Sequence, residues 1–142
     1  MKTFKTISVN VAVLSLLKDA ALPVSDLEDS VHRVFGGLYE EDELIGVVGV
    51  ELHPPAGLLR SLAVAQCHRG LGYGSVLVRH AEQLAINAGI TELFLMTTTA
   101  AALFERCGYR CLPRAAAPES IRKSQQFAGL CPGTAEFMMK HL

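Results

Sequence analysis

The stretch Leu58-Leu-Arg-Ser-Leu-Ala-Val-Ala-Gln-Cys-His-Arg-Gly-Leu-Gly-Tyr-Gly-Ser75 decides the fold of this chain. Its first part, residues 58–64, is apolar enough to form a buried strand, and a helix is expected at about 72–88. The turn between them is rich in glycine. Such a turn leaves several N–H groups of the new helix unpaired, and the helix dipole adds partial positive charge there. The stretch therefore predicts a site for a phosphate or pyrophosphate group.

The side chains of this turn support the same prediction. The glycines lack a Cβ, so an anion can approach the main chain closely, and Arg69 adds a permanent cation at the rim. We expect the binding turn to comprise Arg69, Gly70, Leu71, Gly72, Tyr73, Gly74 and Ser75. The alternative is an ordinary glycine-rich turn without a ligand.

Two common nucleotide motifs do not fit the turn. A P-loop requires Gly-Lys-Ser/Thr at the start of the helix, but Gly74 is followed by Ser75 and Val76. A dinucleotide fingerprint requires Gly-x-Gly-x-x-Gly, and the third glycine comes one residue too early here.

The pattern that fits is Arg-x-x-Gly-x-Gly, formed by Arg69, Gly72 and Gly74, and it resembles the acyl-coenzyme A pyrophosphate loop of the GNAT superfamily of N-acetyltransferases. The segment Leu62-Ala-Val64 resembles the central strand of that family, and Phe104-Glu-Arg-Cys-Gly-Tyr109 resembles a helix end of the family. The order of elements is similar from about residue 3 to 142. The segments 58–64 and Phe127-Ala-Gly-Leu-Cys-Pro132 resemble the branch associated with arsenic resistance.

Bulk properties of the chain exclude several classes of protein. A length of 142 residues predicts a single domain, residues 1–142, and 50% hydrophobic with 19% charged residues excludes disorder. No apolar run approaches the roughly 18 residues of a membrane span. The first residues lack the apolar core of a secretion signal, and the four cysteines form no Cys-x-x-Cys pair. We therefore expect no membrane partner, no metal site and a cytoplasmic location with reduced thiols.

Charge is unevenly distributed along the chain. Residues 1–60 hold five Lys/Arg and nine Asp/Glu, whereas residues 61–142 hold eight and five. The basic half contains the glycine-rich turn, which is consistent with an anionic ligand, although ordinary scatter explains the same numbers. Without a lysine-rich stripe or interleaved aromatic residues, nucleic acid is not an expected partner.

The predicted fold class is α/β, with about six or seven strands and about four helices in one mixed sheet. Expected strands are 3–9, 33–39, 44–52, 58–64, 92–97 and 134–140, and expected helices are 10–21, a short one from Ser25, 72–88, 100–107 and 118–130. Arg79, Glu82 and Gln83 should lie on the solvent side of their helix. A right-handed crossover should make 58–64 and 92–97 parallel. The resemblance adds that these two central parallel strands splay apart.

The resemblance implies acetyl-coenzyme A as cofactor and a small amine as acceptor. It implies that backbone N–H groups of Leu62, Ala63 and Val64 polarise the thioester carbonyl, although these residues could also be only core strand. The family usually presents a tyrosine to the leaving thiolate, and Phe104 stands at that position and would line the cofactor. Tyr109 or a water could replace the acid, or none is used, since a thiol pKa near 8.5 makes thiolate a fair leaving group.

The acceptor side of the site has its own expected residues. Glu51 and His53 share a strand face and are the predicted general bases, although a solvated strand end is an alternative. Arg60 lies in an apolar strand and needs a partner, which is either an acidic residue such as Glu51 or a substrate carboxylate. Ser61 is assigned to the acceptor site with it. Arg114 belongs to the basic stretch 105–123, which is either a solvated face or a wall that attracts an anionic, amino-acid-like acceptor.

Two functions of different classes follow. The first is an N-acetyltransferase for a small anionic amine, for which the arsenic-linked resemblance suggests an analogue that carries an oxyanion group. The second is a sensor module that binds acyl-coenzyme A or a soft metal(loid) without turnover, because Phe104 cannot donate a proton. Many relatives are dimers, so the resemblance leaves a homodimer open.

Overall fold

A computed structural model describes residues 2–22, 24, 32–124, 127 and 135–142. In these residues one seven-stranded sheet has the order β1-β2-β3-β4-β5-β7-β6. Its strands are β1 (Lys2–Ile7), β2 (Arg33–Glu40), β3 (Glu43–His53), β4 (Ala56–Val64), β5 (Glu92–Thr97), β6 (Arg110–Cys111) and β7 (Glu136–His141). The helices are α1 (Val11–Asp19), α2 (Tyr73–Asn87), α3 (Ala101–Arg106) and α4 (Glu119–Arg122), with single 3-10 turns η1 (Gln66–His68) and η2 (Arg114–Ala116).

The predicted α/β class and mixed sheet are confirmed. Only β4 and β5 pair in parallel, and every other neighbouring pair is antiparallel. Asn10 caps α1 as expected, because its side-chain oxygen accepts the Val13 N–H at 3.0 Å. The longest helix, α2, has 15 residues, and none in the described ranges combines the length and apolarity that a bilayer crossing requires.

Of the predicted helix 118–130, α4 covers Glu119–Arg122, and most of the remainder lies outside the described residues. The α-helix ends at Arg122, and Ser124 donates its hydroxyl hydrogen bond to the Ile121 carbonyl at 2.7 Å. A serine that bonds nearby backbone offers the chain an alternative to further helix. Residues 125–126 and 128–134, and the short helix expected from Ser25, lie outside the described residues.

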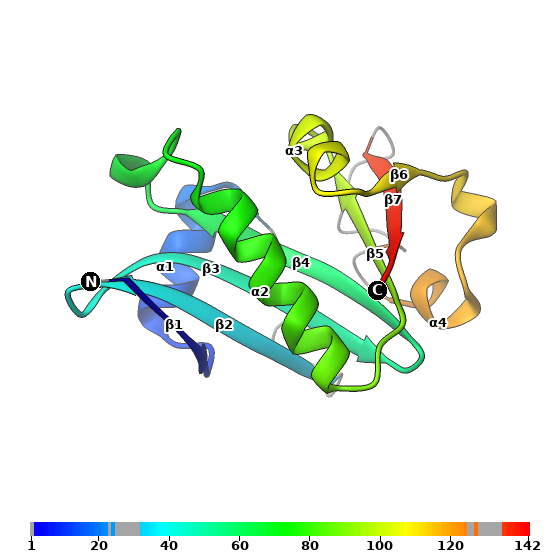
Figure 1. The fold of residues 1–142 in the computed structure, drawn as a ribbon, viewed down its shortest axis with the longest axis horizontal. Helices are drawn as coiled ribbons and strands as arrows, with labels where there is room; N and C mark the ends of the chain where they lie inside the picture. Colours follow the sequence, from blue (N-terminus) through cyan, green and yellow to red (C-terminus); the bar gives the residue numbers. More distant parts are fainter. Residues whose placement is uncertain (1, 23, 25–31, 125–126, 128–134) are drawn as a thin grey trace.

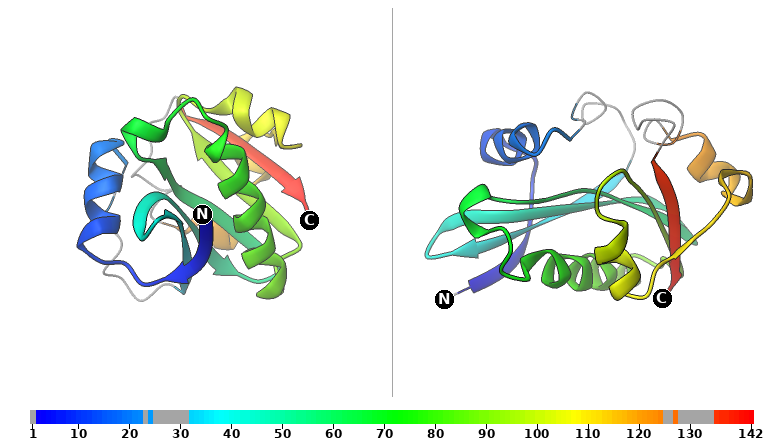
Figure 2. Two further views of the ribbon diagram at one scale, coloured as in Figure 1. Left: turned by 60° about the vertical axis from the view of Figure 1, so that its left-hand side comes forward. Right: turned by 90° about the horizontal axis from the view of Figure 1, so that it is seen from above.

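The helices cover the two faces of the sheet in pairs. α2 and α3 pack on one face, and α1 and α4 on the other (Figure 2). Side chains alternate between the two faces along each strand, so β3 contributes to the core on both faces. Val48 and Val50 of β3 belong to the core under α2, whereas Val47 packs against Val13 and Leu17 of α1. Ile121 of α4 packs with Leu58 and Phe94 on that second face.

The two parallel strands separate along their length, as the resemblance implied. β4 and β5 are paired only from Ala56 to Leu58 on β4, with Leu58 opposite Phe94. Beyond this point β4 continues to Val64 and β5 to Thr97 without pairing to each other, and the strands diverge toward their C-terminal ends (Figure 1). A gap in the ladder therefore opens beside residues 59–64.

A bulge in β4 accompanies this separation. Val47 of β3 lies opposite Ala63, but Gly49 lies opposite Arg60, so two residues of β4, Ser61 and Leu62, face one residue of β3. Ser61 adopts a left-handed conformation with φ 58°. A bulge bends its strand and increases the local twist, and this bulge lies in the part of β4 that is no longer paired with β5.

Candidate active site

The glycine-rich turn places α2 at the C-terminal end of β4. Gly70 and Gly72 have φ of 79° and 86°, a region that residues with a Cβ rarely adopt. A Cβ at either position would meet nothing within 4 Å. These glycines are thus required by the backbone conformation and leave open space beside the turn.

The first turn of α2 offers backbone donors to that space. Within the described ranges, the N–H groups of Tyr73, Gly74 and Ser75 have no hydrogen-bond partner, and the N-cap Gly72 has no side chain to provide one. They stand at the positive end of a helix of 15 residues. Unpaired donors, positive potential and open glycines fit the pyrophosphate of coenzyme A.

Arg69 fixes the turn to the end of β4. Its Nε donates to the Val64 carbonyl at 2.9 Å, while the side chain remains exposed. The exposed guanidinium keeps its positive charge at the rim of the turn. In the same turn, the neighbouring residue Leu71 is also exposed, at 62%. Arg69 therefore links strand and turn and also contributes the predicted charge.

The side chain of Tyr73 points to the first strand. Lys2 Nζ lies 5.4 Å from the centre of the Tyr73 ring, and the His68 ring lies 6.2 Å away. The pKa of Lys2 is raised, first by its hydrogen bond to Tyr73 and then by the charges of Tyr73 and Glu40. Tyr73 thus contributes its backbone N–H to the turn, while its ring packs beside β1.

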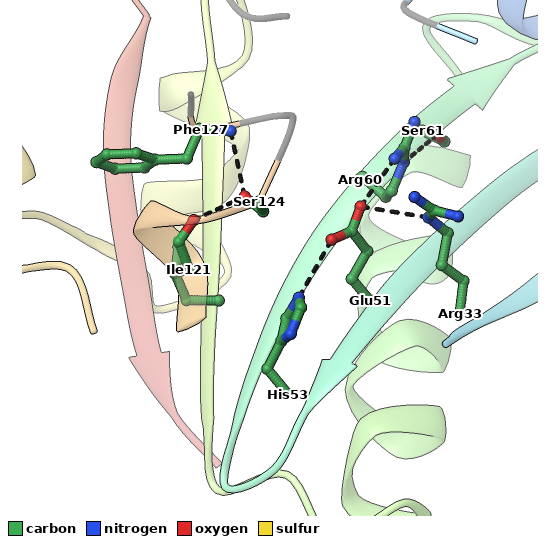
Figure 3. A network of polar contacts seen from close by, with 8 residues as sticks. All are labelled: Arg33, Glu51, His53, Arg60, Ser61, Ile121, Ser124 and Phe127. Carbon is green, nitrogen blue, oxygen red and sulfur yellow. Dashed lines mark hydrogen bonds and ion pairs between the residues drawn. The ribbon is translucent and has the colours of Figure 1, made fainter. Parts of the chain in front are cut away.

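A buried polar cluster occupies the face of the sheet that carries α1 and α4. Glu51 of β3 is 1% exposed, and its Oε2 accepts from Arg60 Nη1 at 2.9 Å and from Arg33 Nε at 3.3 Å. Its Oε1 lies 3.2 Å from His53 Nε2. Figure 3 shows Glu51 between the two arginines on one side and the imidazole on the other. We call Arg33, Glu51, His53, Arg60 and Ser61 the Glu51 cluster.

The cluster answers one question that the sequence left open. Arg60 has an acidic partner within the chain, Glu51, and its Nε also donates to Ser61 Oγ at 3.1 Å. Sequence reasoning missed Arg33, whose only signal is its place at the start of β2. The register, with Arg33 directly opposite Glu51, is what brings it into the cluster.

Tyr109 lies on the opposite face of the sheet, in the core beneath α2 and α3. Its hydroxyl donates to Glu82 Oε2 at 2.9 Å, and Lys140 Nζ lies 3.0 Å from the same oxygen. Burial, followed by the charge of Glu82, raises the pKa of Tyr109. Phe104 is buried beside it, with ring centres 5.6 Å apart. The catalytic role of Tyr109 stays a prediction.

The expectation that Glu82 faces solvent is wrong, because its side chain is only 14% exposed. The carboxylate is drawn inward by Tyr109 and Lys140, two partners distant in sequence that helical periodicity does not reveal.

Arg114 is anchored near the start of β7. Its Nη2 donates to the Ala135 carbonyl at 2.9 Å, and its Cζ lies 5.8 Å from the centre of the Phe127 ring. These contacts give it a structural role in η2, and its predicted part in acceptor binding stays a prediction.

Comparisons with known proteins agree with this geometry. The model of the acetyltransferase (GNAT) family matches residues 12–109, and no curated protein matches. N-acetylglutamate synthase from Neisseria gonorrhoeae, complexed with coenzyme A and N-acetyl-glutamate, superposes with TM-score 0.80 and 21% identity over 100% of this chain. This chain spans 35% of that one, about a third of its length.

Two further solved structures match over nearly the whole of both chains. A GNAT-family acetyltransferase from Staphylococcus aureus gives TM-score 0.75 and 16% identity, with 99% of each chain covered. An IAA acetyltransferase from Bacillus cereus gives TM-score 0.73 and 19% identity, with 100% of each covered. At these identities the neighbours show the fold, and the family model covers more than half of the sequence. The chain belongs to the GNAT family of acetyltransferases.

Proposed function

We propose that this protein is an N-acetyltransferase that moves an acetyl group from acetyl-coenzyme A to the amine of a small, anionic, amino-acid-like acceptor. One observation carries the proposal. The gap between β4 and β5 opens at the strand ends, beside a helix start whose backbone donors are unpaired within the described residues. Ligands of open α/β sheets bind outside the carboxyl ends of the strands in this way.

The cofactor side of the proposal uses backbone groups. Residues 69–75 would hold the pyrophosphate, and bound coenzyme A would supply the acetyl thioester. Leu62, Ala63 and Val64 lie on the β4 side of the gap, past the last pair with β5. Because alternate N–H groups of a strand point to opposite edges, part of this stretch faces the gap and could stabilise a developing oxyanion. Phe104 would contribute an apolar wall.

The acceptor side follows from the layers of the fold. α2, the helix that follows the cofactor turn, lies on one face of the sheet, so we place the acceptor on the other face, which carries the Glu51 cluster. That cluster contains two guanidinium groups and one carboxylate. Guanidinium groups recognise anionic groups well, and Arg60, Ser61 and Arg114 remain the proposed residues for an anionic group of the acceptor.

A neighbour supports the same class of acceptor. The Neisseria gonorrhoeae structure holds N-acetyl-glutamate, an acetylated acidic amino acid. Because the chain also resembles the arsenic-linked branch, we include amino-acid analogues with an arsenic oxyanion among the candidate acceptors.

The test is release of free coenzyme A thiol across a panel of amines. The panel contains amino acids with carboxylate, phosphinate or arsenic oxyanion side chains, and neutral and basic amines of similar size. We expect acceptor-dependent thiol release for the anionic members, and mass spectrometry should find an acetyl group on their nitrogen. Thiol release that never exceeds acetyl-coenzyme A hydrolysis would contradict the proposal.

The alternative is a sensor that binds acyl-coenzyme A or a metal(loid) without turnover. It is favoured by one observation, that Phe104 lacks a hydroxyl and the Tyr109 hydroxyl is bound to Glu82. Calorimetric binding of acetyl-coenzyme A without thiol release for any amine would support it. Cys67, Cys107 and Cys111 are free thiols, and Cys131 lies outside the described residues.

Location and assembly remain proposals of the same kind. Free thiols at Cys67, Cys107 and Cys111 fit the reducing cytoplasm. A homodimer stays a prediction from the resemblance, and sedimentation equilibrium of the full chain tests it.

A further inference from the structure

We infer that His53 takes the proton from the acceptor amine and that Glu51 positions its imidazole. The inference rests on the proposed function. It gives the role of general base to His53 and a positioning role to Glu51. It follows from the ion pairs of Glu51, the two nitrogens of His53 and the register of Glu51 at the closed end of the gap.

The ion pairs of Glu51 determine which nitrogen of His53 carries hydrogen. Glu51 pairs with Arg33 and Arg60 through Oε2, so Oε1 is a carboxylate oxygen that accepts hydrogen bonds. The neighbour of Oε1 at 3.2 Å is His53 Nε2, which must therefore donate. In a neutral imidazole with Nε2–H, the basic lone pair lies on Nδ1.

The two side chains differ in access. Glu51 is 1% exposed and both its oxygens have partners, whereas the His53 side chain is 18% exposed. Within the described part of the chain, no hydrogen bond reaches His53 Nδ1. An acceptor amine or a bridging water thus meets Nδ1 before it can meet Glu51.

The strand register places this pair at the closed end of the gap. Glu51 lies opposite Leu58, and Leu58 is the last residue of β4 that pairs with β5. Arg60, the other partner of Glu51 Oε2, is two residues further along β4 and already beside the gap. Residues 69–75, at the open end, would hold the pyrophosphate, and bound coenzyme A would supply the acetyl thioester. His53 is two positions from Glu51 on the same strand face, opposite Ala56 and thus farther from the gap, so a water would relay the proton to its imidazole.

His53 Nδ1 takes one proton from the acceptor ammonium and becomes imidazolium, whose Nε2–H remains bonded to Glu51. The freed amine lone pair forms the C–N bond as the thioester C–S bond breaks, and sulfur leaves with the bonding electrons. The second amine proton passes through solvent to that sulfur, and His53 returns its proton to solvent.

The first test combines a deletion with chemical rescue. His53→Ala should lower kcat by about 10²–10⁴-fold, with acetyl-coenzyme A affinity by calorimetry unchanged, and added imidazole should restore part of the rate. His141→Ala is the matched control, because His141 Nδ1 also lies near a glutamate, Glu92 at 3.7 Å, but is 66% exposed on another strand. The control should keep full activity and show no response to imidazole.

The second test needs no activity. Nitrogen-15 imidazole shifts of the protein without ligand should show His53 protonated at Nε2 and unprotonated at Nδ1 in its neutral form. Glu51→Gln should move the population toward the other tautomer, since an amide N–H₂ can donate to Nε2, and should lower kcat more than it alters the acceptor KM. A wild-type imidazole that carries its hydrogen on Nδ1 overturns the inference.

The outcomes separate this inference from the proposed function. A wild type that turns over an amine while His53→Ala retains full kcat overturns the role of His53 alone. A wild type without turnover of any amine overturns the proposed function, and this inference with it.

Discussion

Tyr109, just past the end of α3, donates its hydroxyl hydrogen bond to Glu82 of α2 at 2.9 Å. Lys140 of β7 reaches the same carboxylate oxygen at 3.0 Å and also donates to the Cys107 carbonyl at 2.9 Å. The three contacts tie two helices and a strand together on the face of the sheet opposite Glu51. A tyrosine so engaged is a structural donor.

We expect Tyr109→Phe to destabilise the protein with little effect on catalysis. Loss of a hydrogen bond to a charged group costs about 1.5–3 kcal/mol, and Lys140 still pairs with Glu82 in the variant. Urea denaturation and steady-state kinetics at neutral pH measure the two effects. A fall in kcat of about 10²-fold or more without a change in stability would instead make Tyr109 the general acid.

The stability difference between wild type and the Tyr109→Phe variant should depend on pH in the alkaline range. The pKa of Tyr109 is raised in the folded state, so its contribution to stability is complete below the tyrosine pKa of the unfolded chain, about 10. Above that pH the unfolded chain ionises first, and the contribution is lost as pH rises toward the folded pKa. The stability difference between wild type and Tyr109→Phe should therefore shrink by up to about 1.4 kcal/mol per pH unit above pH 10. A constant difference across this range would contradict the raised pKa.

The two ends of α2 provide a matched pair for the cofactor turn. Gly72 precedes the helix with φ 86° and Gly89 follows it with φ 85°, and a Cβ would meet nothing within 4 Å at either. Gly72→Ala and Gly89→Ala should each cost about 1–2 kcal/mol of backbone strain. Only Gly72→Ala should also weaken acetyl-coenzyme A binding in calorimetry, because only that glycine adjoins the unpaired donors. Equal affinities in the two folded variants would remove the turn from the binding site.

Much of the fold could be predicted from local pattern. Residues 92–97 form β5 with the predicted bounds, and α2 starts and ends within one residue of the prediction, between two glycines of positive φ. Apolar periodicity and glycine at helix ends are short-range signals that a single sequence carries. The two-residue β6 was missed, because two residues are too few to show any period.

The site was less predictable where it depends on partners distant in sequence. Glu51, His53 and Arg60 stood out as polar residues in apolar strands, but Arg33 joins them only through the antiparallel register of β2 and β3. Ser61 is a further example. The left-handed region favours Gly, Asn and Asp, so a serine gives no sign of a bulge.

Arg60→Ala should strongly destabilise the protein. The Arg60 side chain is fully buried and lies 2.9 Å from a carboxylate that is itself 1% exposed. Removal of one partner of a buried ion pair costs about 3–5 kcal/mol. Arg33, which pairs with the same oxygen at 3.3 Å, should offset part of that cost, so we expect the lower end of the range. Arg79→Ala, on the exposed side of α2, is the control and should change stability by at most about 0.5 kcal/mol. Thermal and urea unfolding measure both, and an Arg60→Ala protein as stable as the control would contradict the structural role of the pair.

Ser61 allows the strain of the bulge to be separated from the hydrogen bond of its side chain. Ser61→Gly and Ser61→Ala both remove the hydroxyl that accepts from Arg60 Nε at 3.1 Å. They differ in backbone preference, because glycine adopts φ near 58° freely and alanine does not. We expect the glycine variant to be the more stable by about 1 kcal/mol in urea denaturation.

Gln83 of α2 is the control for that comparison, since its side chain also makes one hydrogen bond, to Asn87 at 2.9 Å, but from a helical residue. There the order should reverse, with Gln83→Ala more stable than Gln83→Gly by about 1 kcal/mol. The same order of alanine over glycine at both positions would show that Ser61 is not strained. Ser61 lies in the part of β4 that is not paired with β5, so the variant pair measures how much strain the bulge beside the gap stores.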